Sequence, residues 1–342
     1  MKEVFPPKPY DFLSKDDKNQ ILSEIAKLKI VKKEILESVP SETEGLNLKR
    51  VDNFMKSLGL PVRDYVLFND EKSKISESII EIFKKQKYDY DKDAYSFDWA
   101  AMCSNDLDLI FVKRDKEEEI PNKHVDTEAL LVHELAHGSS GFSGCVVDKE
   151  DNSIDSNTNK KKVIMPRLGF SIGKSFDSKM GDFLEEGFAD MLAGKYYKEN
   201  MDVSVKQKLL KIFKHKYGDS HFFNFSTNTR SGLKNLPIPM HHGYLSSDNS
   251  TQFSYRITAM SAFGLELLCA KSPGLFDAMI EARADVNKLR YVIKTIDKIS
   301  PGLYPELRKL KYTQKDLSEG LYLILDRVYD GKLGDYDFSR NL

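Results

Sequence analysis

The stretch that most constrains this chain reads ALLVHELAHG and covers residues 129–138. It contains the pattern His-Glu-x-x-His in an apolar frame that predicts a helix. Residues four apart lie on the same face of a helix, so His133 and His137 can bind one metal ion together. Glu134 lies beside them and can polarise a water molecule held by that ion. Because a catalytic zinc site has three protein ligands and one open position, a third ligand has to come from elsewhere in the chain.

A second apolar stretch with acidic residues, 183–193, supplies candidates for that ligand. It predicts a helix in which the carboxylate of Glu186 points inward, where a charge without a partner is costly. We predict that Glu186 is the third ligand; the alternatives are its neighbour Glu185 as the ligand, or a solvated acidic helix face. Asp190 is four residues further on and on the same face as Glu186. We predict that it accepts the second ring N–H of a ligand histidine, the alternative being a charge on the helix surface.

A site of this composition has a defined chemistry. One Zn²⁺ per chain would lower the pKa of a bound water molecule and polarise a carbonyl group. Glu134 is expected to take the water proton as a general base and to pass it to the leaving amine. A further hydrogen-bond donor should stabilise the oxyanion from the other side.

The two stretches together resemble the gluzincin metallopeptidases, whose third zinc ligand is a glutamate on a second helix. The run Glu-Gly-Phe-Ala from Glu186 onward is similar to a sequence motif that is common in the M1 aminopeptidases. The spacing of Glu186 and Asp190 resembles the thermolysin pattern Glu-x-x-x-Asp. The resemblance implies a zincin-like core and a zinc-dependent peptidase that acts on a peptide or protein substrate.

The sequence departs from both of these families. An insert at residues 141–180 makes the gap between His137 and Glu186 much longer than in either family. Glu185 stands where an asparagine is usual, and the substrate-amine motif of aminopeptidases is not evident upstream of the motif helix. The resemblance therefore extends to the clan and to neither family within it.

The clan resemblance implies two further roles. In zincins an edge strand pairs with the extended substrate above the metal, and residues 99–102 are the candidate for that strand. In M1-like enzymes a tyrosine at the start of a later helix binds the oxyanion, which points to Tyr255. His242 is the rival for this role, by analogy with a thermolysin-like histidine. For each of these residues, plain packing is the alternative.

Apolar periodicity predicts helices along most of the chain, and it predicts few strands. Helices are expected over residues 14–39, 46–58, 76–87, 205–214, 255–270, 275–284, 287–299 and 315–329, in addition to the two motif helices. Hairpins are expected from 95–104 with 107–112 and from 145–147 with 163–165, and a long polar loop is expected over 221–249. We predict an α+β, mostly helical fold with a helical N-terminal region at 1–88, a zincin-like core at 89–200 and a helical C-terminal subdomain at 201–342.

The composition of the chain limits which partners and which cellular compartment are expected. The chain has 52 Lys and Arg against 53 Asp and Glu, which argues against a nucleic-acid partner. No apolar run approaches the length of a membrane span, and the first residues lack the apolar core of a signal peptide. The three cysteines, Cys103, Cys145 and Cys269, are expected to be buried thiols in a reducing compartment. The expected location is the cytoplasm, with export without a signal peptide left open.

Three functions are compatible with the motifs. The first is a zinc-dependent peptidase, the second is a non-catalytic zincin-fold binding protein, and the third is a toxin-like protease specific for one protein. Because a pure binding protein needs no general base, Glu134 favours the first or third. The sequence leaves open the substrate, the choice between endo- and exopeptidase, and the oligomeric state.

Overall fold

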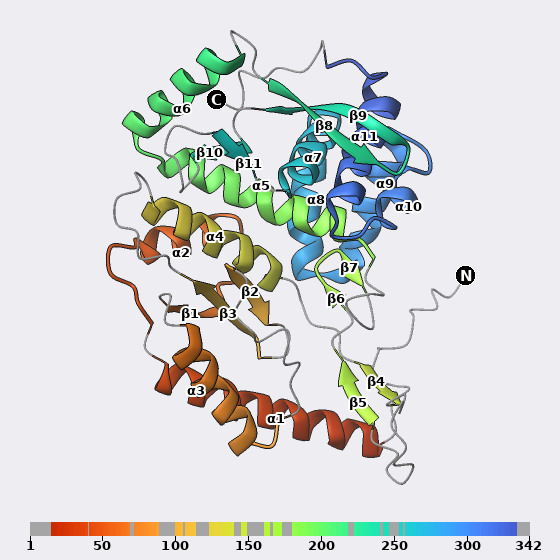
Figure 1. Cartoon of the computed structure of the whole chain (residues 1–342). Coiled ribbons are helices and arrows are strands. Elements are labelled where there is room, and N and C mark those ends of the chain that lie inside the picture. The colour runs from red at the N-terminus through yellow and green to blue at the C-terminus, as the bar shows by residue number, and fades with distance from the viewer. Residues whose placement is uncertain are drawn as a thin grey trace, which may run out of the picture.

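The structure is a computed structural model of the chain. It describes residues 15–39, 41–68, 72–88, 100–104, 107–113, 123–139, 145–148, 161–164, 167–172, 180–217, 222–239, 242–245, 253–255 and 257–333. The described residues are mostly helical and include one small mixed sheet (Figure 1). This confirms the α+β, mostly helical class.

The N-terminal part combines three helices with a three-stranded sheet. The helices are α1 (Lys15–Ser38), α2 (Leu48–Ser57) and α3 (Lys72–Lys85), close to the expected ranges. The sheet has the order β1-β3-β2, from β1 (Asp64–Phe68), β2 (Ala101–Ser104) and β3 (Leu109–Lys113). Strands β2 and β3 form the expected antiparallel hairpin, whereas β1, which pairs in parallel with β3, was not predicted.

Both faces of this sheet are buried, and each face belongs to a different hydrophobic core. Successive side chains of a strand point to opposite faces. On β3, Ile110 and Val112 therefore join a core with α2 and α4, while Leu109 and Phe111 join a second core with α1 and α3. The sheet thus separates the two cores, as its place between these helices in Figure 1 shows.

The two motif helices are α4 (Lys123–Gly138) and α5 (Asp182–Asn200), and they pack against each other. The chain between them forms two small hairpins. One pairs β4 (Cys145–Asp148) with β5 (Lys161–Ile164), as expected, and the other pairs β6 (Arg167–Leu168) with β7 (Ser171–Ile172). The second hairpin brings the insert back to the N-terminal end of α5 (Figure 1).

The C-terminal part is helical with additional hairpins. Its helices are α6 (Val203–Tyr217), α7 (Ala259–Lys271), α8 (Gly274–Ala284), α9 (Leu289–Ile299), α10 (Leu303–Leu307) and α11 (Gln314–Tyr329), with a short 3₁₀ helix at Val286–Lys288. Strand β8 (Phe222–Thr229) pairs with β9 (Gly232–Pro239), and β10 (Gly243–Leu245) pairs with β11 (Phe253–Tyr255).

Two expectations for this part were wrong. Residues 221–249 are not a long loop, because β8, β9 and β10 lie within them. The apolar helix begins at Ala259 rather than at Tyr255, which lies in strand β11.

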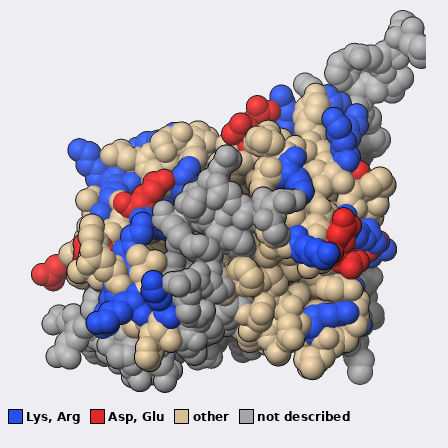
Figure 2. Space-filling view, turned by 90° about the horizontal axis from the view of Figure 1, so that it is seen from above, with Lys and Arg blue, Asp and Glu red and all other residues tan. Residues whose placement is uncertain are grey.

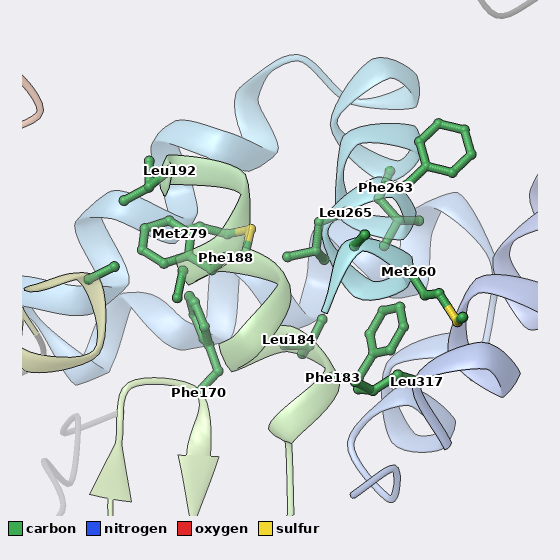
Figure 3. Close-up of a cluster of buried hydrophobic side chains, with 14 of the residues drawn as sticks. Phe170, Phe183, Leu184, Phe188, Leu192, Met260, Phe263, Leu265, Met279 and Leu317 are labelled. Atoms are coloured by element: carbon green, nitrogen blue, oxygen red, sulfur yellow. The ribbon is translucent and has the colours of Figure 1, made fainter. Parts of the chain in front are cut away.

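The larger core forms around α5. Figure 3 shows aromatic and aliphatic side chains from α5, α7, α8 and α11 gathered around this helix. Two glycines allow this close packing: a Cβ on Gly187 of α5 would lie 2.8 Å from the carbonyl oxygen of Ser261, and one on Gly320 of α11 would lie 2.2 Å from the Phe183 ring. The core continues from α4 through α5 to α11, across the predicted boundary at residue 200, which stays a prediction.

On the face seen in Figure 2, a few acidic side chains lie among more numerous lysines and arginines, although the charges of the whole sequence are balanced. Among the described residues, no helix is long and apolar enough to cross a membrane.

Candidate metal centre

Helices α4 and α5 bring three predicted ligands together. His133 and His137 lie one turn apart on α4, with their Nε2 atoms 3.1 Å from each other. Oε2 of Glu186 on α5 lies 3.4 Å from Nε2 of His133 and 3.5 Å from Nε2 of His137. Both histidines are buried and Glu186 is partly buried, so the three atoms meet at the interface of the two helices.

The triangle formed by these atoms fits a zinc ion. Ligand atoms about 2.0 to 2.1 Å from zinc in a tetrahedral arrangement are separated from each other by about 3.3 Å. The three observed separations lie close to that value. Two imidazole nitrogens and one carboxylate oxygen are also a donor set typical of catalytic zinc. The residues therefore fit the ion without rearrangement of either helix.

Asp190 lies where the sequence places it, beside His133. Its Oδ1 is 3.6 Å from Nδ1 of His133, on the side of the ring opposite the triangle, and its side chain is buried. This distance is longer than a direct hydrogen bond. The charge of Asp190 nevertheless acts on His133: burial opposes protonation of this imidazole, but the carboxylates of Asp190 and Glu186 outweigh burial and raise its pKa.

Glu185 lies beside the other histidine. Its Oε1 is 2.7 Å from Nδ1 of His137, and only 1% of its side chain is exposed. Its carboxylate thus lies on the ring edge opposite the triangle, and the three atoms of the candidate site come from His133, His137 and Glu186. The idea of a solvated acidic face is wrong for Glu185.

The buried charges of the centre shift one another's pKa values. Burial opposes protonation of His137, but the negative charges of Glu186 and Glu185 outweigh it and raise its pKa to about 10. Burial likewise opposes ionisation of Glu185, but Arg283 and His137 lower its pKa to about 2. The two histidines lower the pKa of Glu186 well below its usual range, again against the effect of burial. Without a metal, these shifts favour a protonated His137 and ionised Glu185 and Glu186 at neutral pH.

Glu134, the predicted general base, is buried on α4 next to the candidate ligand His133. Helix α4 packs on the edge strand β2. The pKa of the Cys103 thiol on β2 is raised, first by burial and then by the charge of Glu134.

Strand β2 is the candidate substrate strand, and it pairs only with β3 among the described residues. Of the expected segment 99–102, residues 101 and 102 lie in β2, and Trp99 lies outside the described residues. Cys103 and Cys269 are partly rather than fully buried, without a disulfide, and the side chain of Cys145 is outside the described part.

The two candidates for oxyanion binding have different surroundings. Tyr255 ends strand β11, four residues before α7, and its side chain is outside the described part of the structure. His242 is almost completely buried against α7, with its Nε2 3.3 Å from Oε2 of Glu266 and its ring 6.3 Å from that of Phe263. The role of either residue stays a prediction.

Sequence reasoning missed one residue of the centre entirely. Arg283 on α8 is completely buried, and its guanidinium binds both carboxylate oxygens of Glu185, at 2.6 and 2.8 Å. The single signal in the sequence was the arginine itself, in a helix that also carries Asp277 and Glu281. Nothing in the local pattern connects it to a glutamate 98 residues earlier.

Comparison of the chain with protein-family models, with curated proteins and with solved structures gave no match. The site itself is therefore the basis for a functional proposal.

Proposed function

We propose that this protein is a zinc-dependent peptidase of gluzincin type, in which α4, α5 and the β1-β3-β2 sheet form a zincin-like core. The observation that supports it is the triangle of His133, His137 and Glu186, whose edges of 3.1, 3.4 and 3.5 Å suit a tetrahedral zinc site. The general base next to His133 distinguishes this site from a purely structural one, because structural zinc sites use four protein ligands and need no base.

The residues of the chain divide the work. When bound, zinc would supply Lewis acidity toward water and toward the substrate carbonyl. Glu134 accepts the proton of the attacking water and returns it to the leaving amine. Glu185 lies 2.7 Å from Nδ1 of His137 and holds this imidazole so that its Nε2 faces the metal position. Asp190 lies 3.6 Å from Nδ1 of His133 and acts on the other imidazole through its charge. Strand β2 pairs only with β3 among the described residues, and its other edge is where an extended peptide would add as a further strand.

The test begins with the metal. Protein purified without chelator and supplied with zinc should contain about one zinc per chain by elemental analysis. Glu134→Gln should keep that zinc and lose hydrolysis, because the base is removed and the ligands remain. Glu186→Gln should lose most of the zinc. If wild-type protein takes up no stoichiometric zinc under these conditions, the proposal is wrong.

A digestion experiment distinguishes a peptidase from a non-catalytic protein that binds zinc. Wild type and Glu134→Gln are incubated with a peptide library and with a whole-proteome extract, and new termini are identified by mass spectrometry. A general peptidase produces termini in the library, and a protease with one protein target produces them only in the extract. Identical results for the two proteins in both substrates would support the binding protein instead.

A further inference from the structure

The carboxylate of Glu185 has a saturated set of partners. Its Oε1 faces Nδ1 of His137 at 2.7 Å and accepts from Nη2 of Arg283 at 2.8 Å. Its Oε2 accepts from Nη1 of Arg283 at 2.6 Å and from the backbone N–H of Phe170 at 2.7 Å. A carboxylate has about four lone-pair positions. All of them are directed to groups from three other elements, so this side chain has one permitted orientation.

Arg283 holds the surroundings of His137 in two ways. Besides binding Glu185, its Nη2 donates to the carbonyl oxygen of Ala136, the residue before His137. One guanidinium thus fixes the backbone of α4 next to this histidine and, through Glu185, the edge of its ring. Arg283 comes from α8 and contributes no ligand atom to the triangle of the candidate site.

The turn between β6 and β7 closes over this ion pair. The guanidinium lies 5.1 Å from the ring centre of Phe170 and 4.7 Å from that of Phe188, and Figure 3 shows these two rings next to each other. At Gly169, where φ is +56°, a Cβ would lie 1.4 Å from Nη1 of Arg283 and 2.1 Å from Oε2 of Glu185. The turn can approach this closely only because residue 169 is glycine.

We propose that Glu185, Arg283 and the Gly169–Phe170 turn form one positioning unit that holds the His137 ring with Nε2 toward the metal. The insert between the ligand helices is then part of the metal centre, since its turn returns to cover the ion pair. This inference rests on the proposed function, because it assigns the unit a role in metal affinity. Replacing a whole buried ion pair by uncharged side chains often changes the stability of a protein little. A purely structural role therefore predicts that zinc affinity stays the same when both residues are replaced and the chain still folds.

The test compares variants that remove the ion pair without leaving a buried charge. In E185Q/R283M the glutamine oxygen can still accept from Nδ1 of His137, whereas E185L/R283M offers no acceptor. Zinc affinity of the full-length chain is measured by competition with a chromophoric chelator. We expect E185L/R283M to bind zinc about 10- to 100-fold more weakly than wild type, with E185Q/R283M in between.

A second ion pair provides the matched control. Arg230, in the turn between β8 and β9, binds both carboxylate oxygens of Asp316 at 2.7 and 2.6 Å. Asp316 lies on α11. The variant R230M/D316N removes another bidentate arginine–carboxylate pair, which contributes no atom to the triangle, and should leave zinc affinity unchanged. The Co²⁺-loaded proteins add a second readout: the d–d absorption of E185L/R283M should change, because the imidazole is no longer held in place.

The outcomes separate the two proposals. Failure of wild-type protein to bind zinc contradicts the proposed function. If wild type binds zinc and folded E185L/R283M binds it equally well, the positioning unit is wrong and the peptidase proposal is unaffected. If E185L/R283M does not fold, Gly169→Ala takes its place, because the added methyl group displaces Arg283. Unchanged zinc affinity in folded G169A would overturn the unit in the same way.

Discussion

At the scale of single residues, the centre pairs each imidazole with a ligand position on one nitrogen and a carboxylate near the other. Asp190 takes this place for His133 and Glu185 for His137. The two carboxylates differ in their support. Glu185 is bound by Arg283 and by the backbone of Phe170, whereas Asp190 lies 3.6 Å from its histidine. The His137 side of the centre is therefore the more rigidly held.

Zinc binding should release protons. The pKa of His137 is about 10 in the metal-free centre and that of His133 is raised, so His137 is protonated at pH 7. Nε2 has to lose its proton before it can bind zinc. We expect release of about one proton or more per zinc at pH 7, and an apparent affinity that weakens as the pH falls.

Calorimetric titrations with zinc in buffers of different ionisation enthalpy measure this release directly. The observed enthalpy should change in proportion to the ionisation enthalpy of the buffer. A binding enthalpy that is the same in every buffer would show that the histidines are already neutral, and would contradict the charge state described for this centre.

At this scale the sequence predicted what a local pattern can encode. The spacing of His133 and His137 places two imidazoles on one face whatever the rest of the chain does, and Glu186 was recognisable as a charge in an apolar helix. Glu185 was misjudged because its main partner, Arg283, is 98 residues away. A long-range ion pair leaves no trace in helical periodicity, so its role could come only from the tertiary structure.

At the scale of elements, α5 is the helix on which the candidate centre depends most. It supplies Glu186, Glu185 and Asp190 to one neighbour and packs its other faces against α7 and α11. Its contact with α7 is close because residue 187 is glycine. The candidate ligand Glu186 is next to Gly187 in the chain, so the distance between α5 and α7 influences where its carboxylate lies.

Two glycines of α5 allow a matched test of this contact. Gly187→Ala should lower the free energy of unfolding by about 1 to 3 kcal/mol, because the new Cβ meets the backbone of Ser261. Gly194 has nothing within 4 Å of such a Cβ. Gly194→Ala should therefore raise stability by up to about 1 kcal/mol through helix propensity alone.

Urea unfolding of the two variants and of wild type measures both effects. The change in the free energy of unfolding relative to wild type should have opposite signs in the two variants, although both replace a glycine of α5 by alanine. Equal stability of the two variants would mean that α7 moves away from Gly187→Ala at no cost, and that the close contact does not constrain α5.

Helices were predicted better than strands for a physical reason. Their apolar periodicity extends over many residues and survives a few exceptions. Strand β8 was taken for a loop because its inward positions include Thr227 and Thr229, both buried, between exposed polar residues. Thr227 satisfies its hydroxyl on Ser318 of α11 at 3.1 Å. A threonine can face the interior when a residue far away in the chain binds its hydroxyl, and the local sequence pattern does not identify that residue.

At the scale of the whole molecule, the N-terminal helix α2 is joined to α4 and α5 through a buried carboxylate. Glu128 of α4 accepts from the backbone N–H of Asn47 at 2.6 Å, from Arg50 of α2 at 2.6 Å, and from the hydroxyl of Tyr196 on α5. Only 1% of Glu128 is exposed. One side chain therefore connects α2 to both ligand helices.

Removing this carboxylate should weaken the whole fold. We expect Glu128→Ala to lower the free energy of unfolding by about 3 kcal/mol, because Arg50 and Tyr196 lose a largely buried partner. Glu306→Ala is the control: it breaks an ion pair with Arg327 that is exposed on both sides, and should cost less than about 1 kcal/mol. Denaturation followed by circular dichroism compares them, and equal losses would contradict a joining role for Glu128.

The position of Arg283 in the chain also has a consequence for biosynthesis. It is 147 residues beyond Ala136, whose carbonyl it binds, and it follows every proposed ligand. A ribosome that has translated α5 has already made His133, Glu134, His137 and Glu186, but not the guanidinium that binds Glu185 and the carbonyl oxygen of Ala136. A nascent chain therefore carries all of its proposed metal ligands through nearly one hundred further residues of synthesis before Arg283 can bind Glu185.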